Sequence, residues 1–472
     1  MQTKKIPQNE LISGSFRDPS GVVLKRKGSL YRRVNLIYRE SYDFLINSGL
    51  YRSLVEDMLL IPHQEAKKDQ KSNGYFKLIK PEMIPFVSYP YEWSFSQLKH
   101  AALATIQIQK RALEFGMSLK DSSAYNIQFW KGKPILIDTL SFEEYKEGQP
   151  WKGYRQFCQH FLAPLALMSY RDLRLNKLNR AYIDGIPLDL TSSLLPLSTY
   201  LNFSLLTHIH LHARSQNRYA AYSEGDMRRV FLKMQLNPPR VNKLSLLGLI
   251  DSLESVTKRL NYKLRGSQWG DYYSDTNYSK VGFEQKKRVI EKFLKTVKPK
   301  SVWDLGANTG LFSRIASKLD IPVISIDGDP EAVERNYLRC VEEREENILP
   351  LIIDLTNPSP GIGWENKERM SLETRGPVDM IFALALVHHL AVSNNLPFAK
   401  MASFFRSICK FLIIEFIPKS DSNVKRLLLF RKDIFPDYTQ ENFVQEFKQY
   451  FTIKYSVKIR HSQRVLFLME GK

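Results

Sequence analysis

Three carboxylates in the second half of the chain each lie at the end of a short hydrophobic run: Asp304 in SVWDLGANTG, Asp327 in PVISID and Asp354 in ILPLIID. Gly306 and Gly310 follow the first of them. A strand that leads through an acid and two glycines into a helix presents a carboxylate and backbone N–H groups at the carboxyl edge of a sheet, where open α/β sheets bind ligands. Glycine at these two positions permits a positive φ and a close approach of the ligand to the backbone.

The acid at the start of this loop indicates the class of ligand. Dinucleotide-binding loops usually read GxGxxG and carry no acid two residues before the first glycine. Asp304 occupies that place, and a carboxylate is a poor neighbour for phosphate but a good one for a cationic amino-acid group. We therefore expect S-adenosylmethionine, with Asp327 at the ribose hydroxyls and Asp354 at the adenine amino group. A Rossmann-like domain that binds another nucleotide is the alternative.

The stretches WDLGANTG, ISIDGDP and IIDL resemble the class I S-adenosylmethionine-dependent methyltransferases, and the resemblance covers roughly residues 270–472. It implies a doubly wound, seven-stranded Rossmann-like α/β domain. It also implies three groups of cofactor-binding residues: Asp304, Gly306, Asn308 and Gly310 on the methionine side, Asp327 (or Asp329 in its place) at the ribose, and Asp354 with Leu355 at the adenine.

The candidates for catalysis follow the fourth and fifth expected strands. ALALVHHL (383–390) is similar to the His-containing stretch that faces the methyl group in many small-molecule methyltransferases of this class. His388 or His389 is then a general base or orients the acceptor; alternatively one caps the turn and the other packs. Glu415 ends the fifth strand on the same edge. The Asn/Asp-Pro-Pro-aromatic box of enzymes that methylate base amino groups is missing, which disfavours such acceptors.

Strands and helices that alternate along this region position these residues. The pattern predicts parallel strands joined by helical crossovers, hence a sheet covered on both faces. The methyltransferase domain is expected over 266–472, after the polar stretch GSQWGDYYSDTNYSK. Its expected elements are helix 283–297, strands 301–305, 322–327, 348–354, 378–384 and 411–416, helices 395–408 and 439–450, and strands 451–458 and 464–469.

A second constellation lies in LKDSSAYNIQFWKGKPILIDTLSF, residues 119–142. Asp121, Asn126 and Asp138 resemble the catalytic Asp and the two metal-binding residues of protein kinases and aminoglycoside-kinase-like enzymes. The resemblance implies an α+β kinase-like domain over 1–150. Asn126 and Asp138 would then be metal ligands for a magnesium–nucleotide complex. Because no Gly-rich phosphate loop is evident, we expect the fold without useful phosphoryl transfer.

The rest of the front half gives fewer signals. A hairpin is expected over 21–34, helices over 35–60 and 96–115, and two short strands over 77–93. Residues 151–265 are expected to be a mainly helical basic region or the rest of the kinase-like C-lobe, since they carry 17 Lys or Arg against 7 Asp or Glu. The triplet in THIHLH (207–212) would suit a metal if extended, but its flanks predict a helix, which would spread the three histidines apart.

Bulk properties bound the class of protein. The 472 residues exceed what one core supports, so two or three domains are expected. No apolar run is long enough to predict a transmembrane segment, and the start of the chain does not resemble a secretory signal. Three widely spaced cysteines favour a reducing, cytoplasmic environment. The net charge of +20 favours polyanions such as nucleic acid, anionic lipid heads or phosphorylated glycans, or is simply a solvated surface.

Together these patterns predict a methyltransferase that acts on a hydroxyl group of a glycan or small molecule, with the front half recognising the substrate or a partner. Two alternatives stay open: an RNA-directed methyltransferase that uses the basic middle region, and a pseudoenzyme that binds the cofactor for structure only. FRDPSG, SYPYEWSFSQLK and YRQFCQHFLAPLALMSY precede the methyltransferase-like part of the chain. With this order, nearly the whole chain resembles bacterial nodulation-protein-type methyltransferases, for which the acceptor is poorly defined.

Overall fold

The chain divides into two compact units. The computed structural model describes every residue except 1–10, 68–73, 216–240, 264–277 and 430–431. The N-terminal unit comprises Met1–Lys263 together with Ile362–Arg369, and the C-terminal unit comprises Leu264–Gly361 and Met370–Lys472. Residues 1–150 and 151–263 therefore belong to one compact body.

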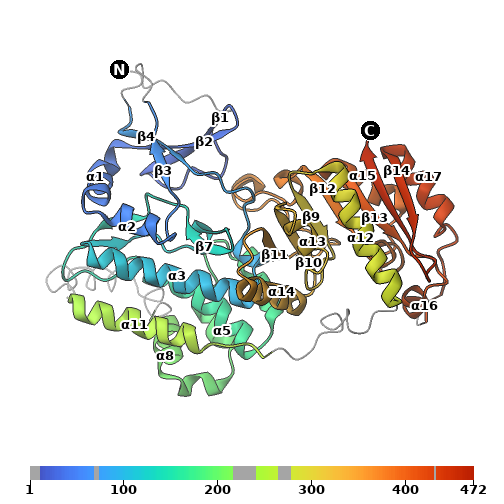
Figure 1. Ribbon diagram of the computed structural model, residues 1–472. Coiled ribbons are helices and arrows are strands. Elements are labelled where there is room, and N and C mark those ends of the chain that lie inside the picture. The colour runs from blue at the N-terminus through green and yellow to red at the C-terminus, as the bar shows by residue number, and fades with distance from the viewer. Residues whose placement is uncertain (1–10, 68–73, 216–240, 264–277, 430–431) are drawn as a thin grey trace. The chain divides into compact units, whose positions relative to one another are not determined.

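A seven-stranded sheet forms the centre of the C-terminal unit (Figure 1), in the order β11-β10-β9-β12-β13-β15-β14. The first five strands in this order are parallel, and β15 runs antiparallel to both β13 and β14. The strands are β9 (Val302–Leu305), β10 (Val323–Asp327), β11 (Ile348–Ile352), β12 (Val378–Ala383), β13 (Cys409–Phe416), β14 (Phe451–Lys458) and β15 (Val465–Gly471).

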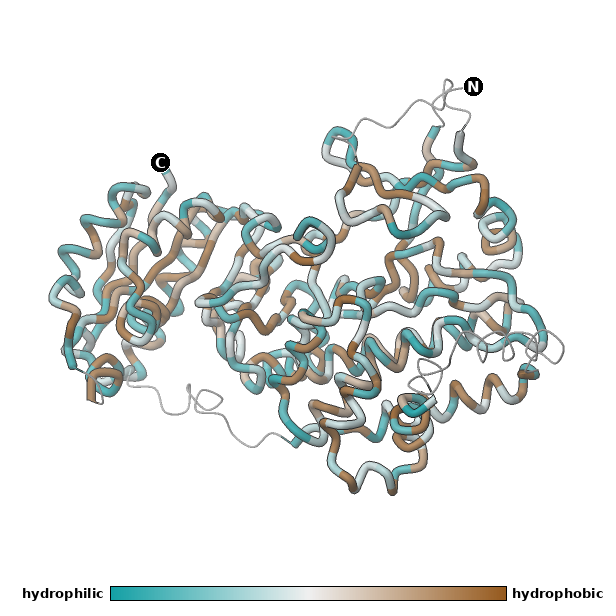
Figure 2. The backbone as a smooth tube through the Cα atoms, turned by 180° about the vertical axis from the view of Figure 1, so that it is seen from behind, coloured by the Kyte–Doolittle hydropathy of each residue, from teal (hydrophilic) through white to brown (hydrophobic). Residues whose placement is uncertain are grey.

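Helices cover both faces of this sheet, as the nearly continuous apolar strands predict. One face packs against α12, α13 and α14 through a core that includes Ile290, Phe312 and Cys340. The other face carries aromatic residues of α15, α17 and β13, among them Phe398 and Phe443. Figure 2 shows the hydrophobic residues concentrated in the strands of this unit. The helices are α12 (Lys280–Val297), α13 (Ser313–Ser317), α14 (Pro330–Glu343), α15 (Phe398–Ile408), α16 (Ser422–Leu428) and α17 (Gln440–Tyr450), with the short helices η10 (Glu373–Arg375) and η11 (His389–Ser393).

The topology creates a binding edge. β9 lies between β10 and β12, so the chain moves outward in opposite directions from this strand. Such a reversal opens a crevice beyond the carboxyl ends of the strands. The loops that follow β9, β10, β11 and β12 all leave from this edge, because these strands are parallel.

The N-terminal unit begins with a four-stranded antiparallel sheet in the order β1-β2-β4-β3. The predicted hairpin is confirmed, with its turn at Lys27 and Gly28, whose φ angles are 46° and 79°. The two strands predicted over 77–93 are only partly right. β4 is a strand, but Pro90–Glu92 is a 3-10 helix, because Glu92 accepts the Tyr89 N–H and fixes a turn there.

Helices make up most of the remainder of this unit. The longest is α3, where the Ser94 hydroxyl and the Gln97 side chain cap the first turn and Gly116, at φ 74°, follows the end. The prediction that residues 151–265 are mainly helical is confirmed for their described part. The elements are β1 (Gly21–Arg26), β2 (Ser29–Val34), β3 (His63–Glu65), β4 (Lys77–Pro81), β5 (Met117–Leu119), β6 (Ile127–Trp130), β7 (Lys133–Leu136), β8 (Phe142–Glu144), α1 (Arg39–Asn47), α2 (Leu50–Glu56), α3 (Phe95–Glu114), α4 (Tyr154–Phe157), α5 (Ala163–Tyr170), α6 (Leu178–Ala181), α7 (Leu188–Leu194), α8 (Phe203–Leu205) and α11 (Lys243–Arg259), with short helices η2 (Leu36–Tyr38), η3 (Pro90–Glu92), η4 (Ala124–Asn126), η5 (Cys158–Leu162), η6 (Leu173–Lys177), η7 (Leu197–Leu201) and η8 (Leu206–Leu211).

A small hairpin between β11 and β12 belongs to the N-terminal unit and was not foreseen. Ile362 and Arg369 exchange both backbone hydrogen bonds, and the turn between them contains η9 (Trp364–Asn366). The Arg17 guanidinium pairs with the buried Glu368 carboxylate at 2.9 Å, and Arg369 lies over the Tyr125 ring. The polypeptide thus leaves the C-terminal unit, contributes this hairpin to the N-terminal unit and returns. In the part of the chain that the structure describes, no helix combines the length and hydropathy needed to cross a bilayer.

Candidate functional site

The glycine loop after β9 has a backbone that only particular residues tolerate. Gly306 and Gly310 have φ angles of 75° and 73°, and Asn308 between them has 52°. A Cβ at position 310 would lie 2.4 Å from the Asn336 Oδ1 atom, so the close packing also excludes a side chain there. Both glycines therefore have the conformation that the sequence predicted for them.

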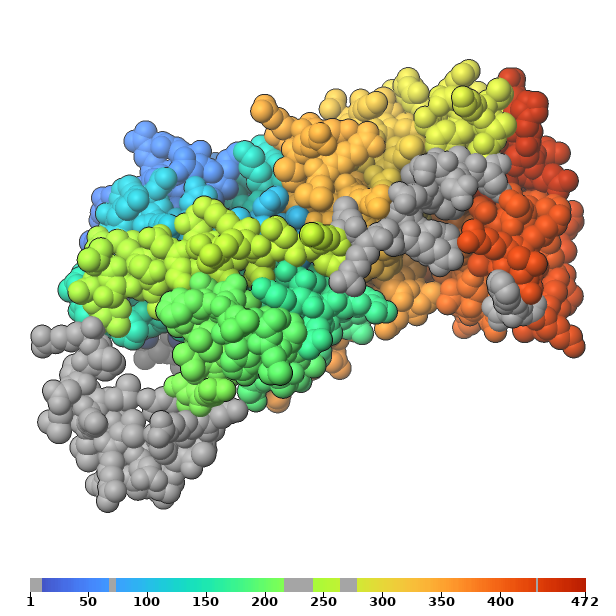
Figure 3. Space-filling model, turned by 90° about the horizontal axis from the view of Figure 1, so that it is seen from below, coloured from blue at the N-terminus to red at the C-terminus, as the bar shows by residue number. Residues whose placement is uncertain are grey.

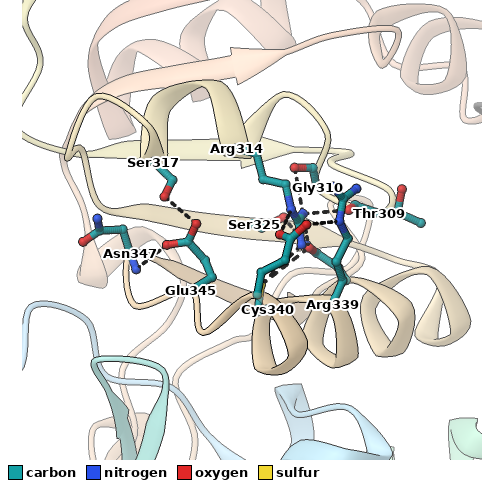
Figure 4. A network of polar contacts seen from close by, with 11 residues as sticks. Thr309, Gly310, Arg314, Ser317, Ser325, Arg339, Cys340, Glu345 and Asn347 are labelled. Atoms are coloured by element: carbon teal, nitrogen blue, oxygen red, sulfur yellow. Dashed lines mark hydrogen bonds and ion pairs between the residues drawn. The ribbon is translucent and has the colours of Figure 1, made fainter.

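A buried arginine holds the loop from behind. Arg314 Nη1 donates to the carbonyl oxygens of Thr309 and Gly310 and to Asn336 Oδ1, at 2.8–3.1 Å (Figure 4). Its Nε atom pairs with Glu343 on α14. Sequence reasoning missed Arg314 and Asn336. The sequence signal that could have identified Arg314 is an arginine in the first helical turn after a glycine loop, but the same pattern is equally typical of a surface residue.

The acid of β9, Asp304, is buried behind this loop, and the acid of β10, Asp327, is partly buried. Asp304 accepts a 2.7 Å hydrogen bond from the Ser313 hydroxyl, and burial raises the pKa of Asp304 to about 7. Asp327 accepts from the N–H groups of Asn308 and Asp329, at 2.8 and 2.9 Å. Burial raises the pKa of Asp327 to about 6, although these two hydrogen bonds lower it. Two desolvated carboxylates beside a backbone turn form a site that is suited to a cationic or hydroxyl-rich ligand.

The third acid, Asp354, comes two residues after β11 and is exposed. Its Oδ1 atom accepts hydrogen bonds from the Thr356 N–H and hydroxyl. A Cβ placed on Gly328 would lie 3.8 Å from the Asp354 Cα atom, so Asp354 adjoins the turn that follows Asp327. Leu355, its neighbour, is half-buried. Asp329 lies at the start of α14, where its side chain accepts the Glu331 N–H.

The segment after β12 lies against the glycine loop. The Leu386 side chain would be 3.3 Å from a Cβ on Gly306. His388 is fully buried, and within the described residues neither of its ring nitrogens has a hydrogen-bond partner. Burial, assisted by His389 and nearby cations, lowers the pKa of His388 far below its usual range. The His389 ring lies 4.1 Å away, and burial lowers its pKa to about 4. A neutral, unpaired imidazole here can accept a hydrogen bond.

Glu415 has a different environment. Its Oε2 atom accepts from Lys286 Nζ at 2.7 Å and from the Ala385 N–H at 2.9 Å, and Oε1 accepts from the Tyr278 hydroxyl. Burial opposes its ionisation, but Lys286 and Arg464 outweigh burial and lower the pKa of Glu415. Both oxygens are engaged, so this carboxylate stabilises the turn after β12. Lys286 was not foreseen, because its place on an amphipathic helix is typical of a solvated lysine.

The structure also brings together Asp121, Asn126 and Asp138 in the N-terminal unit. Asp121 interacts with the Asn126 amide, and burial raises the pKa of Asp121, with a further contribution from Asp138. The Asp138 carboxylate pairs with Arg32 Nη2 at 2.9 Å and accepts from the Ser141 hydroxyl at 2.7 Å. Arg32 is therefore the cation beside the predicted metal ligand, and no sequence pattern indicated it.

The three histidines of THIHLH do not converge. They lie on the π-helical turn η8 and directly after it, as the helical flanks predict. His208 contacts the hydroxyls of Tyr154 and Ser252, whereas His210 contacts those of Ser192 and Thr199. Among the residues that the structure describes, no group of three His, Cys, Asp or Glu side chains could hold a metal ion.

The strand order, the antiparallel strand β15 beside β13 and the glycine loop after β9 define the C-terminal unit as a class I S-adenosylmethionine-dependent methyltransferase. The chain is 32% identical over 469 residues to nodulation protein NoeA of Rhizobium meliloti (strain 1021), a match that covers 98% of this chain and 97% of that protein. The chain belongs to the NoeA family.

Other comparisons are more distant. No protein-family model matches the chain. Magnesium protoporphyrin IX methyltransferase (ChlM) from Synechocystis PCC 6803 with bound SAM is 16% identical, with a TM-score of 0.31 over 43% of this chain and 89% of that one. N-methyltransferase NodS from Bradyrhizobium japonicum WM9 in complex with S-adenosyl-L-homocysteine is 12% identical, with a TM-score of 0.32 over 44% and 93%. Scores at this level establish no shared activity.

Proposed function

We propose that the C-terminal unit transfers a methyl group from S-adenosylmethionine to a hydroxyl group of a glycan or small molecule. The observation that carries this proposal is the buried, unpaired imidazole of His388, two residues after the Leu386 side chain that packs on the glycine loop between Asp304 and Asp327. The residues fit the cofactor. Its ammonium group suits the loop from Asp304 to Gly310, including Gly306 and Asn308.

The remaining cofactor contacts follow from the strand ends. Asp327 would accept the two ribose hydroxyls, since a carboxylate has lone pairs left after two backbone N–H bonds. Asp354 and Leu355, which adjoin the turn after Asp327, would meet the adenine. Asp329 is the weaker ribose candidate, because one of its oxygens already caps α14.

A hydroxyl acceptor needs a general base, whereas an amine acceptor does not, so the unpaired His388 imidazole supports a hydroxyl acceptor. A neutral amine already has a free lone pair, whereas a hydroxyl oxygen becomes a strong nucleophile only as its proton leaves. When bound, S-adenosylmethionine would supply an electrophilic methyl group on a sulfonium whose charge disappears on transfer. His388 would accept the hydroxyl proton at a ring nitrogen while the oxygen–carbon bond forms and the carbon–sulfur bond breaks. Protonation of His388 costs less once the sulfonium charge is gone.

The other two catalytic candidates have lesser roles in this proposal. His389 packs against His388 and can orient it. Glu415 is a positioning residue, because the Ala385 N–H, Lys286 and Tyr278 occupy its oxygens. Through Ala385 it fixes the turn that carries Leu386 onto the glycine loop and His388 into the interior.

For the N-terminal unit we propose a kinase-like fold that recognises the acceptor or a partner and does not transfer phosphate. Asp121, Asn126 and Asp138 have the expected side-chain types close together, which supports the fold. Arg32 pairs with Asp138, and with Asp18 through the same nitrogen, which opposes a magnesium–nucleotide complex at the Asp138 carboxylate. Phosphoryl transfer also needs a covering loop and a cation on the phosphates.

RNA is a second candidate acceptor, because residues 151–265 carry a net charge of +10. Binding to RNA through phosphates would weaken steeply with salt. A third hypothesis, a pseudoenzyme that binds the cofactor for structure only, is disfavoured by the buried His388 imidazole, which has no hydrogen-bond partner among the described residues and is not needed to hold the cofactor.

An isotope experiment tests the proposal. Extracts of cells that lack the gene are incubated with the purified protein and cofactor labelled in its methyl group. We expect label in a glycan or small-molecule fraction that is stable to alkali, as an ether is, and insensitive to ribonuclease. Label in RNA would favour the alternative acceptor, and no label in any fraction, despite cofactor binding, would favour the pseudoenzyme.

A further inference from the structure

Three large apolar side chains of the N-terminal unit point outward from one short segment. Leu197, Leu201 and Phe203 are 84%, 90% and 77% exposed, on η7 and at the start of α8. Isolated exposed hydrophobic residues are ordinary, but three within seven residues form a patch. The green residues in this part of the chain contribute to the face seen in Figure 3.

The segment is held in place and is not a loose loop. The His210 ring contacts the Ser192 and Thr199 hydroxyls at 2.7 and 2.9 Å and stacks on Tyr200 at 3.8 Å. Leu195 and Leu205 are buried in the same stretch. The segment therefore has an inner apolar side that packs and an outer apolar side that the packing of the described residues does not account for.

Arginines lie beside this apolar patch, and the acids near it in sequence include Asp172, which pairs with Arg174, and Asp189. Arg171 Nε donates to the Leu194 carbonyl oxygen, and the Arg214 guanidinium lies 5.7 Å from the centre of the Tyr200 ring. Both arginines are exposed. From position 190 to 215 the sequence contains no Asp or Glu. Apolar side chains bordered by cations match the chemistry of a bilayer surface, where the apolar groups enter the acyl boundary and the cations meet anionic headgroups.

We propose that Leu197, Leu201 and Phe203, with Arg171 and Arg214, dock the protein on an anionic lipid surface. The long arginine stems keep their charged ends at the headgroups while the three apolar side chains insert. This docking is independent of the methyl-transfer site. It would bring the enzyme to acceptors made or held at a membrane.

Vesicle sedimentation tests the docking. The purified full chain is mixed with vesicles of phosphatidylcholine containing about 30 mol % phosphatidylglycerol, enough to give an anionic surface, or of phosphatidylcholine alone. We expect binding to the anionic vesicles and a loss of about tenfold or more in partition for Leu197→Ser/Leu201→Ser/Phe203→Ser. The control Leu36→Ser/Ile37→Ser removes two exposed apolar residues of the same unit (56% and 77% exposed) and should bind like wild type.

Two further measurements separate the alternatives. All three native cysteines are buried, so an environment-sensitive dye on Leu201→Cys reports insertion even if the triple variant misfolds. A blue shift with anionic vesicles supports the proposal. No sedimentation and no blue shift, equal binding by the triple variant, or a dimer in ultracentrifugation that only the triple variant abolishes would overturn it in favour of no ligand, another surface or a second copy of the chain.

Discussion

Single carboxylates set the pH behaviour of the proposed cofactor site. The pKa values of Asp304 and Asp327 rise to about 7 and about 6 by burial, above the ~3.9 of an unfolded chain. Between the unfolded pKa and these two folded pKa values, the folded protein without cofactor therefore binds more protons than the unfolded chain. Their contribution to stability is complete below about pH 4 and is lost as pH rises through the folded pKa values.

The first prediction concerns cofactor-induced stabilisation. A bound cation favours the ionised carboxylates, so S-adenosylmethionine should raise the melting temperature more at about pH 8 than at about pH 5.5, on either side of the two raised pKa values. Differential scanning fluorimetry across this range measures the effect. Asp304→Asn should flatten the pH dependence, whereas Glu342→Gln, an exposed acid on α14, should not. A cofactor effect that is larger in acid would contradict the assignment.

The second prediction concerns His388. Replacing it with Ala should lower kcat at least a hundredfold, the scale of general-base catalysis, with the cofactor Kd unchanged. His389→Ala should lower kcat less, because the His389 ring only packs against His388 and orients it. Single-turnover assays with labelled cofactor and calorimetry separate the two effects. Equal activity in the His388 variant would leave positioning as the only catalytic contribution of this segment.

At the level of elements, the glycine loop packs directly against α14 through Gly310, Arg314 and Asn336. Arg314 and Asn336 fill the space behind Gly310, so a methyl group there meets the Asn336 amide, and φ is 73° in any case. Loop geometry, and with it the proposed cofactor site, depends on a contact between residues 26 positions apart.

The third prediction follows from this contact. Gly310→Ala should destabilise the C-terminal unit by about 1–3 kcal/mol, as expected for a strained backbone and an overpacked site, and should weaken cofactor binding. Gly248→Ala in α11 is the matched control. A Cβ added at Gly248 would have no neighbouring atom within 4 Å, so the exchange should stabilise by about 0.5–1 kcal/mol. Urea denaturation measures both. An unaffected Gly310 variant would show that the loop relaxes freely.

Sequence patterns predicted the elements of the C-terminal unit to within a few residues, because apolar runs and helical periodicity are local signals. They also placed the acids on the right strand ends, since parallel strands share an edge. They could not predict the ion pairs of Lys286 with Glu415 and of Arg32 with Asp138, because an ion pair between distant elements leaves no local sequence pattern. The strand predicted near Tyr89 failed for a related reason: a single side-chain bond from Glu92 overrode an apolar run.

At the scale of the whole molecule, the chain joins a methyltransferase to a unit with its own polar cluster, and the hairpin Ile362–Arg369 belongs to that second unit. This hairpin interrupts the connection between β11 and β12, close in sequence to Asp354.

The fourth prediction concerns nucleotide chemistry in that unit. With ATP and Mg²⁺ we expect no detectable turnover and little thermal shift, since Arg32 already pairs with Asp138. Arg32→Ala should free the carboxylate and increase any metal-dependent shift, and Asp138→Asn should abolish it. Asp184→Asn, an exposed acid of the same unit, serves as the control. ATP turnover by the wild type that is lost in Asp121→Ala would establish an active kinase.

The most direct measurement is calorimetric titration of the full chain with S-adenosylmethionine. We predict binding by the wild type and by Glu342→Ala, and at least tenfold weaker binding by Asp327→Ala, because two charge-assisted hydrogen bonds of ~1.5–3 kcal/mol each would be lost. No binding of S-adenosylmethionine by the wild type, together with tight binding of NAD, would contradict the central claim.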